Sequence, residues 1–335
     1  MQIAELSVLL VWGAATALTI ALVAFAIDLG RRTEERVDAR AETRTPAAVG
    51  AASGQTPAPA STRPAGEAGV DAAAPRRRAA GIAMSTTWLG TALLLVGIVL
   101  RGIAAGRTPW ANMYEFTLVG SFMALAVFLG MSLRKDVRYL GAFVTGLTVL
   151  FVALGLNVFY VAATGVQPAL QNYWLVLHVG VAICATGIFT VAFVASVLQL
   201  LRDSRDGGAP YLLRPGFRWL DRVPTPTSLE GLSFRLNAVG FVLWTFTIIG
   251  GAIWAEHAWG RYWGWDPKEV WSFVIWVVYA AYLHARTTRG WDGRRAAWFV
   301  IVGYLCVLFN FTGVNLIFNG KHSYSGLETD ATGGA

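Results

Sequence analysis

Long apolar runs alternate with short polar segments along almost the whole chain. Eight runs are long enough, or nearly so, to cross a bilayer as helices of about 20 residues. They lie near 5–27, 87–106, 115–133, 138–156, 173–201, 234–255, 267–286 and 296–318. A helix satisfies its own backbone hydrogen bonds, as the membrane interior requires. The pattern therefore predicts an all-α fold: a polytopic integral membrane helical bundle with about eight transmembrane helices.

The segment 31–85, between the first and second runs, has a different composition. It is rich in Ala, Pro, Gly, Ser and Thr and contains no aromatic residue. Such a segment cannot bury enough apolar surface to fold, so we expect a disordered linker. The predicted organisation is an N-terminal anchor (1–30), this linker, a transmembrane domain (86–325) and a disordered tail (326–335). The polar loop 202–233 carries apolar and aromatic residues among arginines, and we expect it to lie along a membrane surface.

The placement of charge predicts the orientation. Residues 1–6 hold Glu5 and no Lys or Arg, whereas a secretory signal peptide begins with a basic region. The first run is therefore expected to be a retained anchor with the N-terminus outside. In that orientation, segments 31–85, 134–138, 202–235 and 286–295 face the cytoplasm and hold 22 of the 27 Lys and Arg residues. This asymmetry follows the positive-inside rule and predicts that both termini lie outside.

Composition excludes several classes of protein. The chain is 55% hydrophobic and 14% charged, against about 25% charged in ordinary soluble domains. The net charge of +7 is explained by the cytoplasmic loops, so no nucleic-acid partner is expected. Cys184 and Cys306 lie in separate apolar runs and form no CxxC pair, which excludes a thioredoxin-type site and a cysteine-based zinc site.

Six of the 14 tryptophans fall within residues 254–276, on the side predicted to face outward. They are interleaved with Gly260 and Gly264, which let a flat molecule approach the backbone. An aromatic belt at the membrane interface is the plain alternative. The density of the cluster favours a platform for a flat aromatic ligand.

Two acids in this segment, Asp266 and Glu269, could be paired catalytic carboxylates. Their spacing around Pro267 fits the N-cap, N1 and N3 positions of a helix better. We therefore expect them to begin the seventh helix and to hold the tryptophan loop at a fixed angle.

Four histidines complete the candidate chemistry. His178 and His322 fall at the outer ends of the fifth and eighth runs, His257 in the outer segment, and His284 near the inner end of the seventh run. A lone histidine is often a packing residue, but an ionisable side chain in a membrane span suggests function. Two histidines flanking an aromatic platform fit the two axial positions of haem iron. Zinc would require a third or fourth ligand close by.

At these residues the sequence resembles a known family. The run Trp259-Gly-x-Tyr262-Trp263-x-Trp265-Asp266-Pro267-Lys268-Glu269-x-Trp271 resembles the WWD signature of haem-handling proteins. A second similar stretch is Pro109-Trp110-Ala-Asn112-Met-Tyr114-Glu115. With the eight-run layout and the flanking histidines, residues 86–325 resemble the CcsA/ResC branch of System II cytochrome c biogenesis.

The resemblance implies the roles of individual residues. His178 and His322 match external-face haem ligands and are the implied catalytic pair, and His284 matches an intramembrane haem ligand supplied from the cytoplasm. The implied platform around haem b comprises Trp259, Tyr262, Trp263, Trp265, Asp266 and Trp271. A separate ResB/Ccs1-type membrane protein is the implied partner. The implied activity is that of a cytochrome c haem lyase in the plasma membrane, joining haem to the CxxCH motif of an apocytochrome c on the extracytoplasmic face.

Two other functions stay open at this point. One is a haem-delivery protein of the CcmC kind, which does not ligate haem. The other is a non-haem transporter or scaffold that uses its tryptophans only as an interface belt. In the ligation reading the substrate's thiols attack the haem vinyl groups, so no catalytic triad is expected. Candidate propionate partners are Arg107, Arg261, Lys268 and Lys321, and His257 has no assigned role.

Overall fold

A computed structural model describes residues 2–42, 78–163, 165, 172–318 and 320–322, with the backbone alone for 31–42. These ranges contain helices and connections and no strand. The elements are α1 (Ile3–Glu42), α2 (Arg78–Ala105), α3 (Met113–Ser132), η1 (Arg138–Leu140), α4 (Gly141–Asn157), α5 (Tyr173–Asp206), η3 (Pro215–Arg222), α6 (Pro226–Trp259), α7 (Pro267–Thr288), α8 (Gly293–Phe311) and α9 (Gly313–Ile317).

The prediction of an all-α polytopic membrane protein is confirmed. Seven helical segments of the described chain are long and apolar enough to cross a membrane: α1, α2, α3, α4 with η1, α5, α6, and α8 with α9. The seventh predicted span, which corresponds to α7, does not reach the same hydropathy. Its sequence includes five Trp, Tyr and Phe residues and four ionisable ones. Its 22 residues still make a helix about 33 Å long, enough for a hydrocarbon core of about 30 Å.

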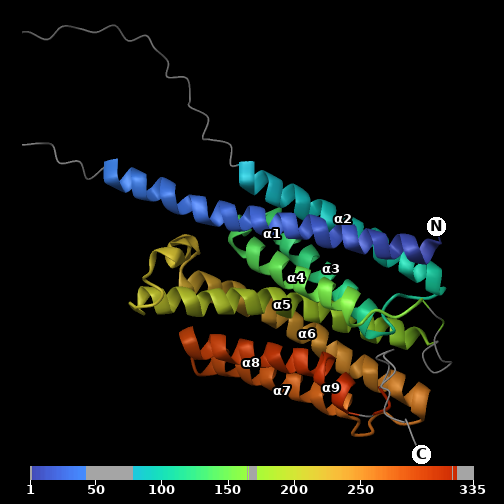
Figure 1. The fold of residues 1–335 in the computed structure, drawn as a ribbon. Coiled ribbons are helices and arrows are strands. Elements are labelled where there is room, and N and C mark those ends of the chain that lie inside the picture. Colours follow the sequence, from blue (N-terminus) through green and yellow to red (C-terminus); the bar gives the residue numbers. More distant parts are fainter. Residues whose placement is uncertain (1, 43–77, 164, 166–171, 319, 323–335) are drawn as a thin grey trace, which may run out of the picture.

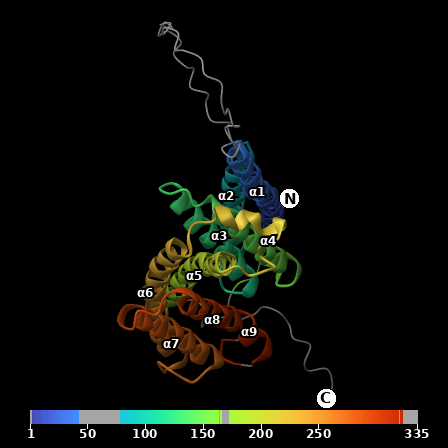
Figure 2. The same ribbon diagram turned by 90° about the vertical axis from the view of Figure 1, so that its left-hand side faces the viewer.

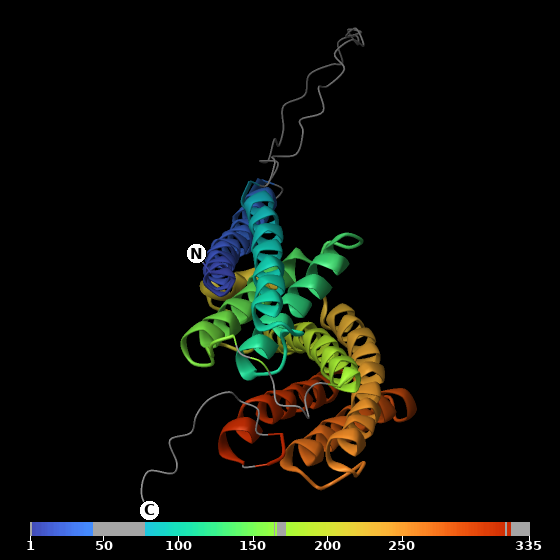
Figure 3. The same ribbon diagram turned by 90° about the vertical axis from the view of Figure 1, so that its right-hand side faces the viewer.

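Helices that follow one another in the chain pair as hairpins: α1 with α2, α3 with α4, α5 with α6, and α7 with α8. Figure 1 shows the hairpins side by side, and Figures 2 and 3 show them from the two ends. Helix α5 is central because it packs on α3, α6 and α8. It contributes to both hydrophobic clusters, one spanning α1–α5 and the other α5–α8.

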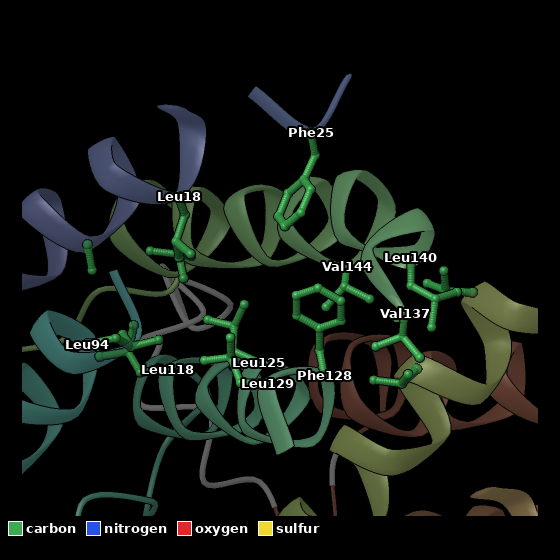
Figure 4. Packing of buried hydrophobic residues seen from close by; sticks show 14 of the residues in the cluster. Leu18, Phe25, Leu94, Leu118, Leu125, Phe128, Leu129, Val137, Leu140 and Val144 are labelled. Carbon is green, nitrogen blue, oxygen red and sulfur yellow. The ribbon is translucent and has the colours of Figure 1, made fainter. Parts of the chain in front are cut away.

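The first cluster joins the N-terminal helices tightly. In Figure 4, Leu18 and Phe25 of α1 face Leu125 and Phe128 of α3, with Val144 of α4 beside them. The rings of Phe25 and Phe128 meet edge to face, with their centroids 5.9 Å apart. The N-terminal anchor therefore packs into the bundle as an integral helix.

Several boundaries differ from the sequence expectation. Helix α1 continues to Glu42 and α2 begins at Arg78, so helices enter the range 31–85 from both sides. The rest of the predicted linker, 43–77, and the predicted tail lie outside the described residues. The run near 296–318 is divided at Thr312 into α8 and α9.

The loop 202–233 packs in part against the bundle, since its side chains Leu212 and Leu220 are buried in the first cluster. Its expected position along a membrane surface stays a prediction. The guanidinium of Arg205 donates two hydrogen bonds of 2.7 Å to the Asp221 carboxylate, and this contact helps to fold η3 back onto the bundle. Tyr211 and Leu213 remain exposed.

The two ends of the bundle differ in chemistry. We call the end that carries the α6–α7 connection (260–266) and α9 the tryptophan end, and the end that carries η3 the arginine end. The N-terminal end of α1 and the α9 helix both lie at the tryptophan end in Figure 1.

Candidate haem site

A cavity of about 190 Å³ opens at the tryptophan end among α3, α5, α6, α7 and α8. Most of its lining side chains are apolar or aromatic. His178 and His322 both line it, as do Tyr262, Trp263 and Lys268. The structure therefore brings together two histidines that lie 144 positions apart in the sequence.

His178 lies in the second turn of α5, and α6 fixes its ring. Its Nδ1 lies 2.8 Å from the backbone carbonyl oxygen of Thr247. Because a carbonyl can only accept, Nδ1 carries the proton and the Nε2 lone pair remains available. The ring also lies against Gly251, where a Cβ would stand 2.6 Å from the His178 Cε1 atom. Glycine at this position leaves room for the imidazole.

His322 is oriented by a carboxylate. Its Nδ1 lies 2.7 Å from Oδ2 of Asp266, so Nδ1 again donates and Nε2 again remains available. Burial raises the pKa of Asp266, but its hydrogen bonds from His322 and from the backbone N–H groups of Lys321 and Lys268 outweigh burial and hold that pKa below its usual value. Asp266 is therefore a carboxylate at neutral pH.

A tryptophan that the sequence reading left without a role connects the two histidines. Trp254 is buried, and its ring lies parallel to that of His178 with centroids 6.2 Å apart. The same ring is 5.5 Å from His322. Trp259 meets both Trp254 and His322 edge to face, at 4.7 and 4.9 Å. The imidazoles thus belong to one aromatic cluster.

The predicted capping box at the start of α7 is confirmed. The Glu269 carboxylate accepts from the backbone N–H groups of Gly264 and Asp266, at 2.8 and 3.1 Å. Asp266 accepts in turn from the N–H of Lys268 at 3.2 Å. These bonds fix the tryptophan loop to the first turn of α7.

The remaining predicted platform residues lie in different environments. Tyr262 and Trp263 line the cavity, whereas Trp271 packs on Phe309 with centroids 4.4 Å apart. Trp265 is 78% exposed and contacts Trp263. Its φ of 57° lies in the left-handed region, where few non-glycine residues occur. The tryptophan loop therefore holds this exposed residue in a strained backbone conformation.

The other two histidines lie away from the cavity. His284 is exposed on α7 toward the arginine end, 18 residues beyond Asp266. That separation is about 27 Å along a helix. His257 is exposed too, and its Nδ1 bonds to the carbonyl of Ile253 in its own helix.

The stretch 109–115, which the sequence marked only by resemblance, forms part of the cavity wall. Trp110 and Asn112 line the cavity, and Asn112 also caps α3 by accepting from the N–H of Glu115. Phe116, one position further, stacks on Phe311 of α8 with centroids 5.0 Å apart, and both rings line the cavity. A link between α3 and α8 could not be read from local pattern.

The four candidate propionate partners lie in different environments. Arg107 pairs with Glu115 at 2.6 Å, and the Lys321 ammonium lies 5.5 Å from the centroid of the Trp259 ring. The Arg261 guanidinium packs against Gly264. Of the four, Lys268 lines the cavity, with its Nζ donating to Oδ1 of Asn315 at 2.6 Å.

The donor set fits haem iron. Two imidazoles, each held in the fold through Nδ1, line an apolar and aromatic cavity, and axial ligation of a haem would use the Nε2 of each. Among the described residues, no group of three or more His, Cys, Asp or Glu side chains could hold a metal ion.

A model of the family described as "Cytochrome C assembly protein" matches residues 110–322, a range that includes Trp110, His178, the capping box and His322. The chain belongs to this family. The resemblance found in the sequence is confirmed, and membership of the cytochrome c assembly family places the protein in cytochrome c biogenesis.

Curated relatives in the cytochrome c assembly family carry the name cytochrome c biogenesis protein CcsA. The chain is 34% identical to the one from Prochlorococcus marinus over 256 residues, which covers 69% of this chain and 80% of that protein. For the relative from Synechococcus sp. (strain CC9902), identity is 37% over 259 residues, with coverages of 69% and 83%. For the one from Chlamydomonas reinhardtii, identity is 34% over 239 residues, with coverages of 69% and 65%.

A solved structure called cytochrome c haem lyase CcmF shares the fold. Its TM-score is 0.60 at 15% sequence identity, and the alignment covers 93% of this chain and 47% of that one. The chain thus spans about half the length of CcmF, and at this identity the likeness supports the arrangement of helices alone.

Proposed function

We propose that this protein binds haem b between His178 and His322 at the tryptophan end and presents it there for covalent attachment to an apocytochrome c. The observation that carries the proposal is the pair of imidazoles that each bond through Nδ1 and leave Nε2 available beside one cavity. The count of basic residues supports an extracytoplasmic position for this end. The plasma membrane is the location that we propose.

The chemistry demands little from acid or base side chains. Each cysteine thiol of the apocytochrome CxxCH motif adds across a haem vinyl group: a carbon–sulfur bond forms, and the thiol hydrogen ends on the neighbouring vinyl carbon. The addition has no net oxidation or reduction. The protein holds the iron through the two imidazoles and holds the ring among Trp254, Trp263 and Tyr262. Such positioning can lower a barrier by about 7–11 kcal/mol.

Lys268 supplies the polar anchor in this proposal. Its ammonium lines a largely apolar cavity and bonds to the neutral amide of Asn315. A haem propionate is a carboxylate, and a charge-assisted hydrogen bond from Lys268 would fix the rotation of the haem in its plane.

His284 belongs to an earlier step in the proposal. It is exposed on α7, so a histidine from another membrane protein can approach its ring. A partner of the ResB/Ccs1 type would supply that second ligand as haem passes from the cytoplasm.

The test is maturation of a reporter c-type cytochrome by the full chain co-expressed with a ResB-type partner, together with absorption spectra of the purified complex. We expect the spectrum of six-coordinate, bis-histidine haem and accumulation of the covalent cytochrome. A colourless preparation after haem supplementation would overturn the proposal. Haem bound without covalent product would instead favour delivery of the CcmC kind.

A further inference from the structure

Asp266 accepts three hydrogen bonds at the tryptophan end. Oδ2 accepts from Nδ1 of His322 at 2.7 Å and from the N–H of Lys268, in the first turn of α7, at 3.2 Å. Oδ1 accepts from the backbone N–H of Lys321 at 2.6 Å. The carboxylate therefore joins the tryptophan loop and α7 to the segment that carries His322, and its side chain is only 5% exposed.

The neighbouring backbone leaves room for this carboxylate. A Cβ at Gly320 would lie 2.5 Å from Oδ1 of Asp266 and 3.2 Å from Cδ of Pro267. Because the Asp266 side chain is short, it could not move aside and still keep its three bonds. Glycine at position 320 therefore leaves the space that the Asp266 carboxylate occupies. Capping of α7 alone would not require this close approach of residue 320.

The two cavity histidines receive different support. His178 donates to a neutral backbone carbonyl, whereas His322 donates to a buried carboxylate. A hydrogen bond to an anion is shorter and roughly twice as strong as one between neutral groups. It also raises the basicity of the far ring nitrogen of a metal-bound histidine.

We propose that Asp266 is a positioning residue that aims Nε2 of His322 into the cavity and strengthens it as an iron ligand. This inference rests on the proposed function. A more basic axial nitrogen favours ferric over ferrous iron, so Asp266 lowers the reduction potential of the bound haem. His322 is then the stronger and His178 the weaker of the two ligands.

The experiment measures the midpoint potential and the ferric haem affinity of the purified full chain. Asn is also a good N-cap, so Asp266→Asn keeps α7 capped while removing the negative charge. We expect the potential to rise and ferric haem to bind about 10- to 100-fold more weakly, as is typical when the partner of a metal-bound histidine is lost.

A second variant reaches the carboxylate without changing it. Gly320→Ala pushes a methyl group toward Oδ1 and should raise the potential in the same direction. The matched control is Glu256→Gln, which neutralises a partly exposed acid near the end of α6, and it should leave both quantities unchanged.

The inference is overturned if Asp266→Asn and Gly320→Ala both bind haem with the wild-type potential and affinity. Failure of the underlying function looks different: His322→Gly would then keep the wild-type haem spectrum. If Asp266→Asn does not fold, the potential of Gly320→Ala decides the question alone.

Discussion

Each cavity histidine uses its Nδ1 atom to hold its place in the fold, and the proposed function assigns its Nε2 atom to the haem iron. The division is enforced by acceptors that cannot donate: the Thr247 carbonyl for His178 and the Asp266 carboxylate for His322. Each acceptor therefore holds a proton on the Nδ1 atom that faces it.

Removing one imidazole should leave a gap that a small molecule can fill. We expect His178→Gly or His322→Gly to abolish maturation of the reporter cytochrome while haem remains near His284, and added imidazole to restore part of the activity. His284→Gly should instead deplete haem at both positions, because the proposed function has haem supplied through His284. The measurements are holocytochrome yield and haem content.

The control for this series is His257→Ala, which removes an exposed ring bonded only within the neighbourhood of its own helix turn. It should mature the reporter almost normally. If His178→Gly were fully active and His257→Ala inactive, the ligand pair would have to be His257 and His322.

Lys268 offers a separate test of how the haem is oriented. Lys268→Met removes the cation from the cavity wall, and the lost charge-assisted bond is worth about 1.5–3 kcal/mol, or roughly 10- to 150-fold in haem affinity. Lys268→Arg should retain most of the binding. Titration of each purified variant with haem measures these affinities. Lys135→Met, at an exposed lysine, serves as the control. If Lys268→Met binds haem as tightly as the wild type does, Lys268 is not part of the site.

At the scale of elements, α7 combines two demands. It must span the membrane, and it must hold the tryptophan loop at its first turn. Glu269 meets the second demand by accepting from two loop N–H groups. The polar first turn and the aromatic body of the helix explain why its hydropathy falls below that of the other spans.

Glu269→Ala should therefore destabilise the loop while leaving the histidines chemically intact. The expected loss is about 0.5–2 kcal/mol, the range for a lost helix cap. A thermal melt followed by tryptophan fluorescence should show a lower Tm than in wild type. Glu256→Ala, at a partly exposed acid near the end of α6, should change the Tm little; equal melting of the two variants would contradict a structural role for Glu269.

At the scale of the whole molecule, the end of the bundle where α1 begins is also the end that carries α9. An even number of membrane crossings brings the two ends of a chain to the same side of the membrane. The seven apolar helical segments and α7 together make eight crossings. Alkaline phosphatase fused after residue 60 should be inactive and fused after residue 330 active, because the enzyme works only outside the cytoplasm. The opposite pair of activities would invert the orientation and move the cavity to the cytoplasmic face.

The fold was predictable from sequence because membrane helices are specified by local composition, and the tryptophan loop because its residues are consecutive. His178 and His322 could be placed at one face by topology alone. The hydrogen bond between Asp266 and His322 could not, since it joins positions 56 residues apart. The contacts of Trp254 and the folding of η3 onto the bundle were hidden for the same reason: they depend on tertiary packing.

The shared helix α5 has a mechanical consequence. The cavity draws one wall from α3 and the opposite walls from α6, α7 and α8, and the stacked pair Phe116–Phe311 bridges them. A small rocking of the N-terminal hairpins about α5, as about a hinge, would part those two rings and widen the mouth of the cavity. A protein that binds α1 or α2 and shifts these helices would thereby change the width of the cavity without contacting the residues that line it.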